Sequence, residues 1–422
     1  MTRRLLLALA LVVIVSIETG LRLGANSPDT RFTLPGYGLG YFWDTPLGWT
    51  GLVDGVTVNR DAEQFSSLAG FLHGQPVPVP PADNVYVRFA GYALIGSSLA
   101  PLVGVYASFV LINMAFWVAA ALATYVLAVR RTSDQRIAVL AALLVSTAPA
   151  FAALAGQPLP YVASYGLFAL ALLLFDQVRL FERGTKLSTA AAAGFAAGLG
   201  LLVYDLYMLP AFVVAYGLLR RTSWRTLAVV LVAMALPRLA WSGYWQLMHL
   251  PSYSHNETHP IEALYAWFDD ARTGTGVLAK IKGYLMLAGH GALNIGAAFM
   301  FWPVLLAIWE LWQRRRWPEA RWFAAVAVAG FGPALFMLST WPHLPRWYGY
   351  AFPAVYILAA AGAVRIAGSL SVPHVSVVRR ASLAAAVLVP AVLMANLDAL
   401  GYTKIMELLL FQPERWSYLW SP

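Results

Sequence analysis

The 422-residue chain has no cysteine and few charged residues, and each shortage excludes a class of protein. Without cysteine it forms neither disulfides nor thiolate metal sites, so any portion outside a membrane must be held together by packing. Charged residues make up only 12% of the chain, whereas hydrophobic residues make up 60%. A soluble domain of this length could not hide so much apolar surface. The composition therefore indicates an integral membrane protein.

The short motifs of several enzyme classes are also missing. We find no glycine-rich phosphate loop, no dinucleotide-binding fingerprint and no Ser/His/Asp grouping. The stretch "HLPSYSHNETH" contains His255 and His259, which could chelate zinc if they lay on a helix. Pro251 and Pro260 argue against a helix, so no metal site is predicted. The cofactor requirement is left open, a divalent metal included.

The chain does contain a series of long apolar segments. A membrane-spanning helix needs about 20 mostly apolar residues. The first segment begins at Leu5, after Arg3 and Arg4; it resembles a signal peptide, but we interpret it as a retained first helix because a polytopic protein follows. The other segments lie at about residues 105–129, 137–154, 160–175, 187–204, 206–219, 226–243, 284–309, 322–338, 349–364 and 382–398. We predict an all-α membrane protein of about eleven spans, forming one domain over residues 1–422.

The net charge of +9 reports topology rather than nucleic-acid binding. With the N-terminus in the cytoplasm, the predicted cytoplasmic loops hold 18 of the 29 Lys and Arg residues but only five of the 20 acids. This asymmetry is the one that membrane insertion imposes. The extracytoplasmic segments at 25–104, 244–283 and 399–422 are longer and rich in aromatic residues, which favours order and function. We expect a bacterial inner membrane with a periplasmic active site.

Residues 59–74, "NRDAEQFSSLAGFLHG", form the most informative polar stretch. From Asp61 to His73 the stretch reads as an amphipathic helix, with Phe65, Leu68, Ala69 and Leu72 on one face, and we expect it at the membrane surface. A second apolar piece, 89–103, lies too close to the next span to be one itself. We interpret it as re-entrant or interfacial.

Three blocks of the sequence are informative together: the acid-x-acid opening of that helix, "YVRFAGYALIGSSLAPLVGVYASFVLINMAF" at 86–116, and "LPRWYGYAFPAVYILAAAGAVRIAG" at 344–368. They resemble blocks of the GT-C superfamily of integral membrane glycosyltransferases, and are similar to the protein mannosyltransferases and lipid A aminoarabinose transferases. The family commonly has adjacent acids, whereas here Ala62 separates Asp61 from Glu63. The resemblance implies transfer of a sugar from a polyprenyl-phosphate donor to a glycan, lipid or protein acceptor on the outer face of the membrane.

The resemblance also implies that Asp61, as first acid of the motif, is the general base, with Glu63 in support. The plainer interpretation is that Asp61 is a helix N-cap forming a capping box with Gln64. Both acids reach one site only if Asp61 stands just before the helix, since residues two apart on a helix lie about 200° apart.

Further residues are candidates for substrate binding. Arg88 and Arg346 fall in the resembling blocks, with Tyr348 beside the latter, and would hold phosphate or sugar. Asp205 lies at an outer span boundary, where charge is costly and tends to be functional. Asp44 sits among aromatics that could stack on sugars. Lys280 and Lys282 could meet a lipid headgroup, although anchoring of a helix end is the commoner role of such lysines.

Two other functions share part of this pattern. A transporter or flippase of lipid-linked saccharides would need polar residues well inside its spans, and this chain keeps most of its acids in loops. A membrane scaffold would not need an acidic outer cavity. We therefore favour the glycosyltransferase.

Overall fold

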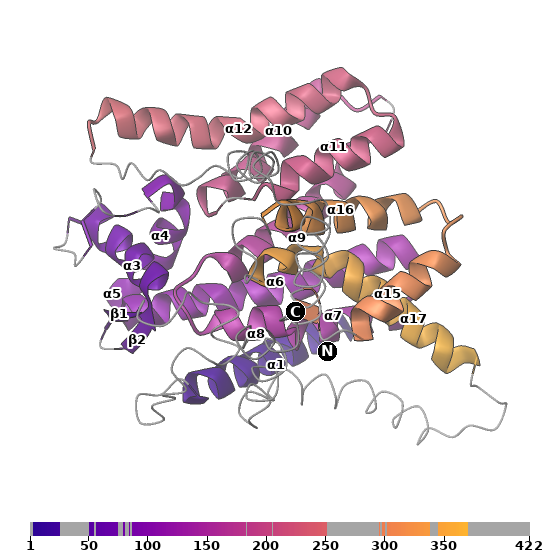
Figure 1. Cartoon of the computed structure of the whole chain (residues 1–422), viewed down its shortest axis with the longest axis horizontal. Helices are drawn as coiled ribbons and strands as arrows, with labels where there is room; N and C mark the ends of the chain where they lie inside the picture. The colour runs from indigo at the N-terminus through magenta and orange to yellow at the C-terminus, as the bar shows by residue number, and fades with distance from the viewer. Residues whose placement is uncertain are drawn as a thin grey trace, which may run out of the picture.

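The computed structural model describes residues 3–25, 50–54, 56–74, 79–80, 84, 87–182, 184–204, 206–250, 295, 298–299, 302–337 and 345–369. These residues form a bundle of helices with a group of short elements at one end (Figure 1). The helices of the bundle are α1 (Arg3–Ala25), α6 (Val105–Thr132), α7 (Gln135–Ser146), α8 (Pro149–Ala155), α9 (Tyr161–Gln177), α10 (Leu187–Gly198), α11 (Met208–Arg220), α12 (Trp224–Leu247), α15 (Trp302–Gln313), α16 (Ala320–Met337) and α17 (Phe352–Ser369).

The predicted helical membrane fold is confirmed. Ten of the eleven predicted segments contain helix, and the last, at 382–398, lies outside the described residues, so the number of spans stays a prediction. Within the described part of the chain, four helical segments are long and apolar enough to cross a membrane: Val105–Thr132, Gln135–Ala152, Trp224–Leu247 and Tyr348–Gly368. α6 alone extends about 40 Å at 1.5 Å per residue, which exceeds the hydrocarbon thickness.

The short elements gather around the start of α6, and we call this region the α3 end. It contains β1 (Thr50–Val53), β2 (Val56–Asn59), α3 (Arg60–Leu72), η2 (Val87–Phe89), α4 (Ala90–Ser97) and α5 (Ala100–Val103). α4 and α5 are too short to cross a bilayer, as the sequence indicates for this piece. The antiparallel hairpin, which the sequence analysis did not predict, turns at Asp54, whose φ is +51°. A two-residue Asp-Gly connection is typical of such turns.

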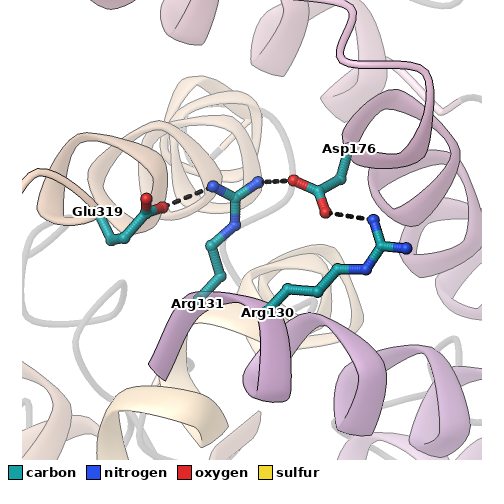
Figure 2. A network of polar contacts seen from close by, with 4 residues as sticks. All are labelled: Arg130, Arg131, Asp176 and Glu319. Atoms are coloured by element: carbon teal, nitrogen blue, oxygen red, sulfur yellow. Dashed lines mark hydrogen bonds and ion pairs between the residues drawn. The ribbon is translucent and has the colours of Figure 1, made fainter. Parts of the chain in front are cut away.

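At the opposite end of α6, arginines are bound into a network of ion pairs (Figure 2). Arg130 and Arg131 of α6 both pair with Asp176 of α9, the first at 2.8 Å, and Arg131 also pairs with Glu319 before α16. The Arg131 guanidinium lies 5.0 Å from the centre of the Trp322 ring. We call this region the arginine-rich end. Because the Arg131 guanidinium of α6 binds both α9 and the residue that precedes α16, the network fixes the relative positions of these three helices.

We predict that Asp176→Asn destabilises the protein by about 3 kcal/mol, because Arg131, whose side chain is only 11% exposed, then keeps a single carboxylate partner. Denaturant unfolding in detergent measures this. Arg136→Gln is the control, since Arg136 is 78% exposed in its pair with Asp134 and exposed pairs contribute less than about 1 kcal/mol. Equal unfolding midpoints for the two variants would contradict the structural role of the network.

Two glycines four residues apart bring α10 and α12 into backbone contact. A Cβ atom added at Gly194 would lie 2.5 Å from the Val230 carbonyl oxygen, and one added at Gly198 would lie 2.2 Å from that of Met234. Small residues at this spacing let membrane helices approach closely. The contact places the last turns of α10 and η3 (Leu199–Leu202) beside α12.

Gly198→Ala should therefore separate α10 from α12 and destabilise the fold by about 1 to 3 kcal/mol through overpacking. Gly243→Ala, on α12, has no neighbour within 4 Å of the new methyl and should leave stability unchanged or raise it by up to about 1 kcal/mol. Thermal unfolding of the two variants side by side tests the packing; a loss at Gly243 as large as at Gly198 would refute it.

Candidate functional site

α3 begins immediately after the hairpin, at Arg60, so position 61 lies within its first turn. The residue before the helix is Asn59, and the interpretation of Asp61 as N-cap is wrong. Positions 61 and 63 are about 200° apart around a helix axis, so the two acids do not share one face. The two acids could reach one site only if Asp61 stood just before the helix, and it lies within the helix instead.

The apolar face predicted for α3 is correct, and it is covered by protein. Phe65, Leu68 and Ala69 are each 1% exposed, and Leu72 is half-buried. The Phe65 ring meets the Tyr92 ring of α4 edge to face, with centroids 5.4 Å apart. Glu63 is half-buried on the same helix. The packing against α4 therefore sets the orientation of α3.

Asn84, which follows α3 in the chain, contacts the N-terminal half of that helix. The buried Asn84 side chain donates from Nδ2 to the Gln64 carbonyl oxygen at 2.6 Å. This hydrogen bond lowers the cost of burying the Asn84 amide, because a buried polar group needs a partner. The segment that leads to η2 therefore starts beside the predicted acidic positions.

η2, which carries Arg88, is held between α12 and the segment after η3. Trp241 of α12 donates from Nε1 to the Val87 carbonyl oxygen at 3.1 Å, and the Phe89 and Tyr204 rings lie 5.1 Å apart. Tyr204 directly precedes Asp205 in the chain. Phe89 and Tyr204, which are 115 positions apart in the chain, are thus in contact, and each is the immediate neighbour of a predicted site residue.

The first turn of α9 joins this region to η4 (Pro345–Ala351), which carries Arg346 and Tyr348. The Tyr161 hydroxyl lies 3.0 Å from that of Tyr204, and the Ser164 hydroxyl lies 2.6 Å from that of Tyr350. Tyr348 is 1% exposed and packs near Phe331. It therefore lies inside the protein, and its role in substrate binding stays a prediction.

The remaining predicted residues fall outside the part of the chain that the structure describes. These are Asp44, Asp205, Lys280 and Lys282, together with the side chains of Asp61, Arg88 and Arg346. The histidine stretch at 255–259 also lies outside. Among the described residues, no group of three or more His, Asp or Glu could hold a metal.

Several residues that support the α3 end were missed by the sequence analysis. Asn113, in α6, accepts a hydrogen bond from the Tyr92 hydroxyl at 3.2 Å and donates to the Gln157 carbonyl oxygen at 2.8 Å. The Tyr106 hydroxyl donates to the Gly156 carbonyl oxygen at 2.7 Å. The signal available in the sequence was an Asn within an apolar segment, because a polar group inside a span must be paired.

Asp54 is a further residue that the sequence analysis missed. Its carboxylate accepts a hydrogen bond from the Tyr106 backbone N–H at 2.8 Å, so the hairpin turn caps the start of α6. Gly104, at the N-cap position, has φ +84° and no side chain to do this. A Cβ there would lie 2.9 Å from the Asp54 carboxylate, so glycine is needed for the approach.

Two cavities in the described part lie away from the α3 end. One, of 380 Å³, is apolar and lies between α1 and α6, next to Leu7 and Val129. The other, of 140 Å³, adjoins the ion network and is lined by Arg131, Asp176 and Glu319 among others. Because those charges pair with one another, we assign no substrate to it.

We expect Asp54→Ala to cost about 1 kcal/mol of stability and to speed hydrogen exchange in α3, since the hairpin that leads into α3 loses its anchor on α6. Asp134→Ala is the matched control. Asp134 caps α7 by accepting from the Arg136 N–H at 2.8 Å, and the Arg136 side chain holds the pKa of Asp134 below its usual range. That variant should lose similar stability without changing exchange in α3; unchanged exchange in the Asp54 variant would argue against the anchor.

Comparison with known proteins finds similarity at the level of structure. No protein-family model matches the chain, and no curated protein matches it significantly. The structure is similar to ArnT from Cupriavidus metallidurans, solved bound to undecaprenyl phosphate, with a TM-score of 0.56 and 16% identity over 94% of this chain and 75% of that one. It is also similar to the oligosaccharyltransferase AglB from Archaeoglobus fulgidus, solved with an inhibitory peptide and a dolichol-phosphate, with a TM-score of 0.54 and 16% identity over 92% of this chain and 55% of that one.

These matches confirm the predicted GT-C membrane fold. The likeness extends over nearly the whole of this chain, whereas the chain spans only about half the length of the oligosaccharyltransferase.

Proposed function

Taking the shared GT-C fold as the premise, we propose that the protein is a membrane glycosyltransferase that uses a polyprenyl-phosphate-linked sugar as donor. The observation that carries the proposal is the likeness over 94% of the chain to ArnT, whose structure was solved with undecaprenyl phosphate bound. AglB, the second similar structure, was solved with a dolichol-phosphate. Both carriers are long isoprenoid lipids with a phosphate headgroup, so the same donor chemistry suits this chain.

The reaction proceeds at the α3 end. A hydroxyl or amide of the acceptor attacks the anomeric carbon of the sugar, the bond between that carbon and the phosphate oxygen breaks, and the lipid phosphate leaves. Asp61 takes the proton of the acceptor, and the configuration at the anomeric carbon inverts. Positions 61 and 63 lie on different faces of α3, so we assign the base role to Asp61 alone and a supporting role to Glu63.

The leaving phosphate needs cations near the reacting centre. Arg88 and Arg346 are assigned this role, with Asp205 orienting the acceptor. This assignment is supported by the contacts among their chain neighbours: Phe89 with Tyr204, Tyr204 with Tyr161, and Tyr350 with Ser164. The arginine-rich end faces the cytoplasm and the α3 end faces the periplasm of a bacterial inner membrane, following the charge rule for membrane insertion.

Asp61→Asn should abolish sugar transfer while leaving expression and folding intact, because the amide cannot accept the acceptor's proton. The assay follows release of undecaprenyl phosphate when the purified full-length protein receives undecaprenyl-phosphate-linked pentoses and hexoses together with a cell-envelope extract as acceptor. Glu182→Gln, an exposed acid beside Arg179 at the arginine-rich end, is the control and should remain active.

Transfer by the Asp61 variant at the wild-type rate would remove the base assignment. Movement of intact donor across the bilayer without release of lipid phosphate would replace the transferase by a flippase.

A further inference from the structure

The apolar cavity beside α1 has the form of a slot along one face of α6, and we call it the α1–α6 slot. Its lining on α6 follows helical spacing and consists of Leu122, Tyr125, Val126, Val129 and Arg130. At 1.5 Å per residue these positions extend over about 12 Å of the helix axis. The volume of 380 Å³ is many times the roughly 30 Å³ that one water molecule occupies in the liquid. The slot is therefore large enough for part of a lipid chain.

The slot opens toward the lipid side of the bundle. Leu7 lines it from α1, which contacts both α6 and α7 (Figure 1). Leu7, Leu122 and Val126 are half-buried, and the neighbouring Leu6 and Leu9 of α1 are exposed. α6 is long and apolar enough to cross a membrane, so a groove with such walls faces hydrocarbon.

The polar groups of the slot lie at one end only. Arg130 belongs to the last turn of α6, at the arginine-rich end, and Gln135 is the first residue of α7. Tyr125 offers a hydroxyl about 7.5 Å from Arg130 along the axis, and Leu122 lies deepest in the membrane. A phospholipid in this leaflet has the same order of groups, with phosphate at the edge, ester carbonyls below it and acyl chains toward the bilayer centre.

Arg130 keeps donors for a second anion. It binds Asp176 through Nη1 at 2.8 Å, and its other terminal nitrogen points away from Asp176 and Arg131 (Figure 2). A guanidinium has five N–H donors, and its planar edge matches two oxygens of a phosphate. Arg130 and Arg131 share the carboxylates of Asp176 and Glu319, and α1 opens with the arginines at positions 3 and 4. Positive charge is therefore in excess at this end of the slot.

We propose that the α1–α6 slot binds one anionic phospholipid of the leaflet at the arginine-rich end, with its phosphate on Arg130 and one acyl chain between α1 and α6. Basic pockets between membrane helices suit the headgroups of acidic lipids. A lipid bound only to the folded protein stabilises it, here by filling the space between α1 and α6. The site lies at the opposite end of α6 from the α3 end and does not depend on the proposed transferase.

Phosphatidylglycerol with a photoactivatable diazirine in one acyl chain tests the slot, with the full-length protein in phosphatidylcholine nanodiscs. After irradiation, mass spectrometry should find label on α6 around residues 122–126. Val126→Trp fills the slot and should lose this label, and Leu7→Trp closes it from α1 and serves if the first variant does not fold. Leu111→Trp is the matched control: Leu111 is exposed on the same helix outside the slot, so the label should stay.

The headgroup is tested with a phosphatidylcholine probe that carries the same diazirine. Wild type should be labelled more strongly by phosphatidylglycerol, and Arg130→Gln should lower that preference by about fivefold, the loss expected for one basic residue near a lipid surface. Arg136→Gln is the control, because Arg136 is exposed and pairs with Asp134. Equal labelling of wild type and both slot variants overturns the site. Equal labelling of wild type by the two probes, or an unchanged preference in Arg130→Gln, overturns the anionic headgroup.

Discussion

A charge inside hydrocarbon has to be paired or moved to an edge, and the structure is arranged around that constraint. At the arginine-rich end, Arg131 is shared between Asp176 and Glu319, and the buried Glu310 of α15 is bound by Arg314 and Arg365. These pairs join α6 to α9 and α16, and α15 to α17. Charges that insertion requires at one edge of the membrane thus also fix the helices at that edge.

The α3 end is held by different forces. Its contacts are hydrogen bonds between single side chains and backbone groups, such as Asp54 on the start of α6 and Asn84 on α3. Aromatic rings fill the spaces between them, from Phe65 on Tyr92 to Phe89 on Tyr204. Such contacts hold backbone segments in place, and among these four only the one at Asp54 uses a charged side chain. Ion pairs therefore dominate at the arginine-rich end, whereas hydrogen bonds to the backbone and ring contacts dominate at the α3 end.

Much of the fold was predictable because its signals are local. The apolar segments gave the helices, and the spacing of Phe65, Leu68 and Ala69 gave both the existence of α3 and its buried face. The hairpin before α3 was missed because its strands are only four residues long, too short for an alternating pattern to stand out. The Asp-Gly turn was present in the sequence, but its role in capping α6 was not, because Asp54 and Tyr106 are 52 residues apart.

The sequence by itself determined the membrane class, the segregation of positive charge and the helical nature of the stretch around position 61. Each follows from composition or from the period of a single helix, which neighbouring residues carry. Only the tertiary structure decided that α3 starts before Asp61, that Phe89 meets Tyr204, and that Trp241 donates to the Val87 carbonyl oxygen. These contacts depend on how close two backbones approach, as at Gly194 and Gly198, and no local pattern contains the partner across that gap.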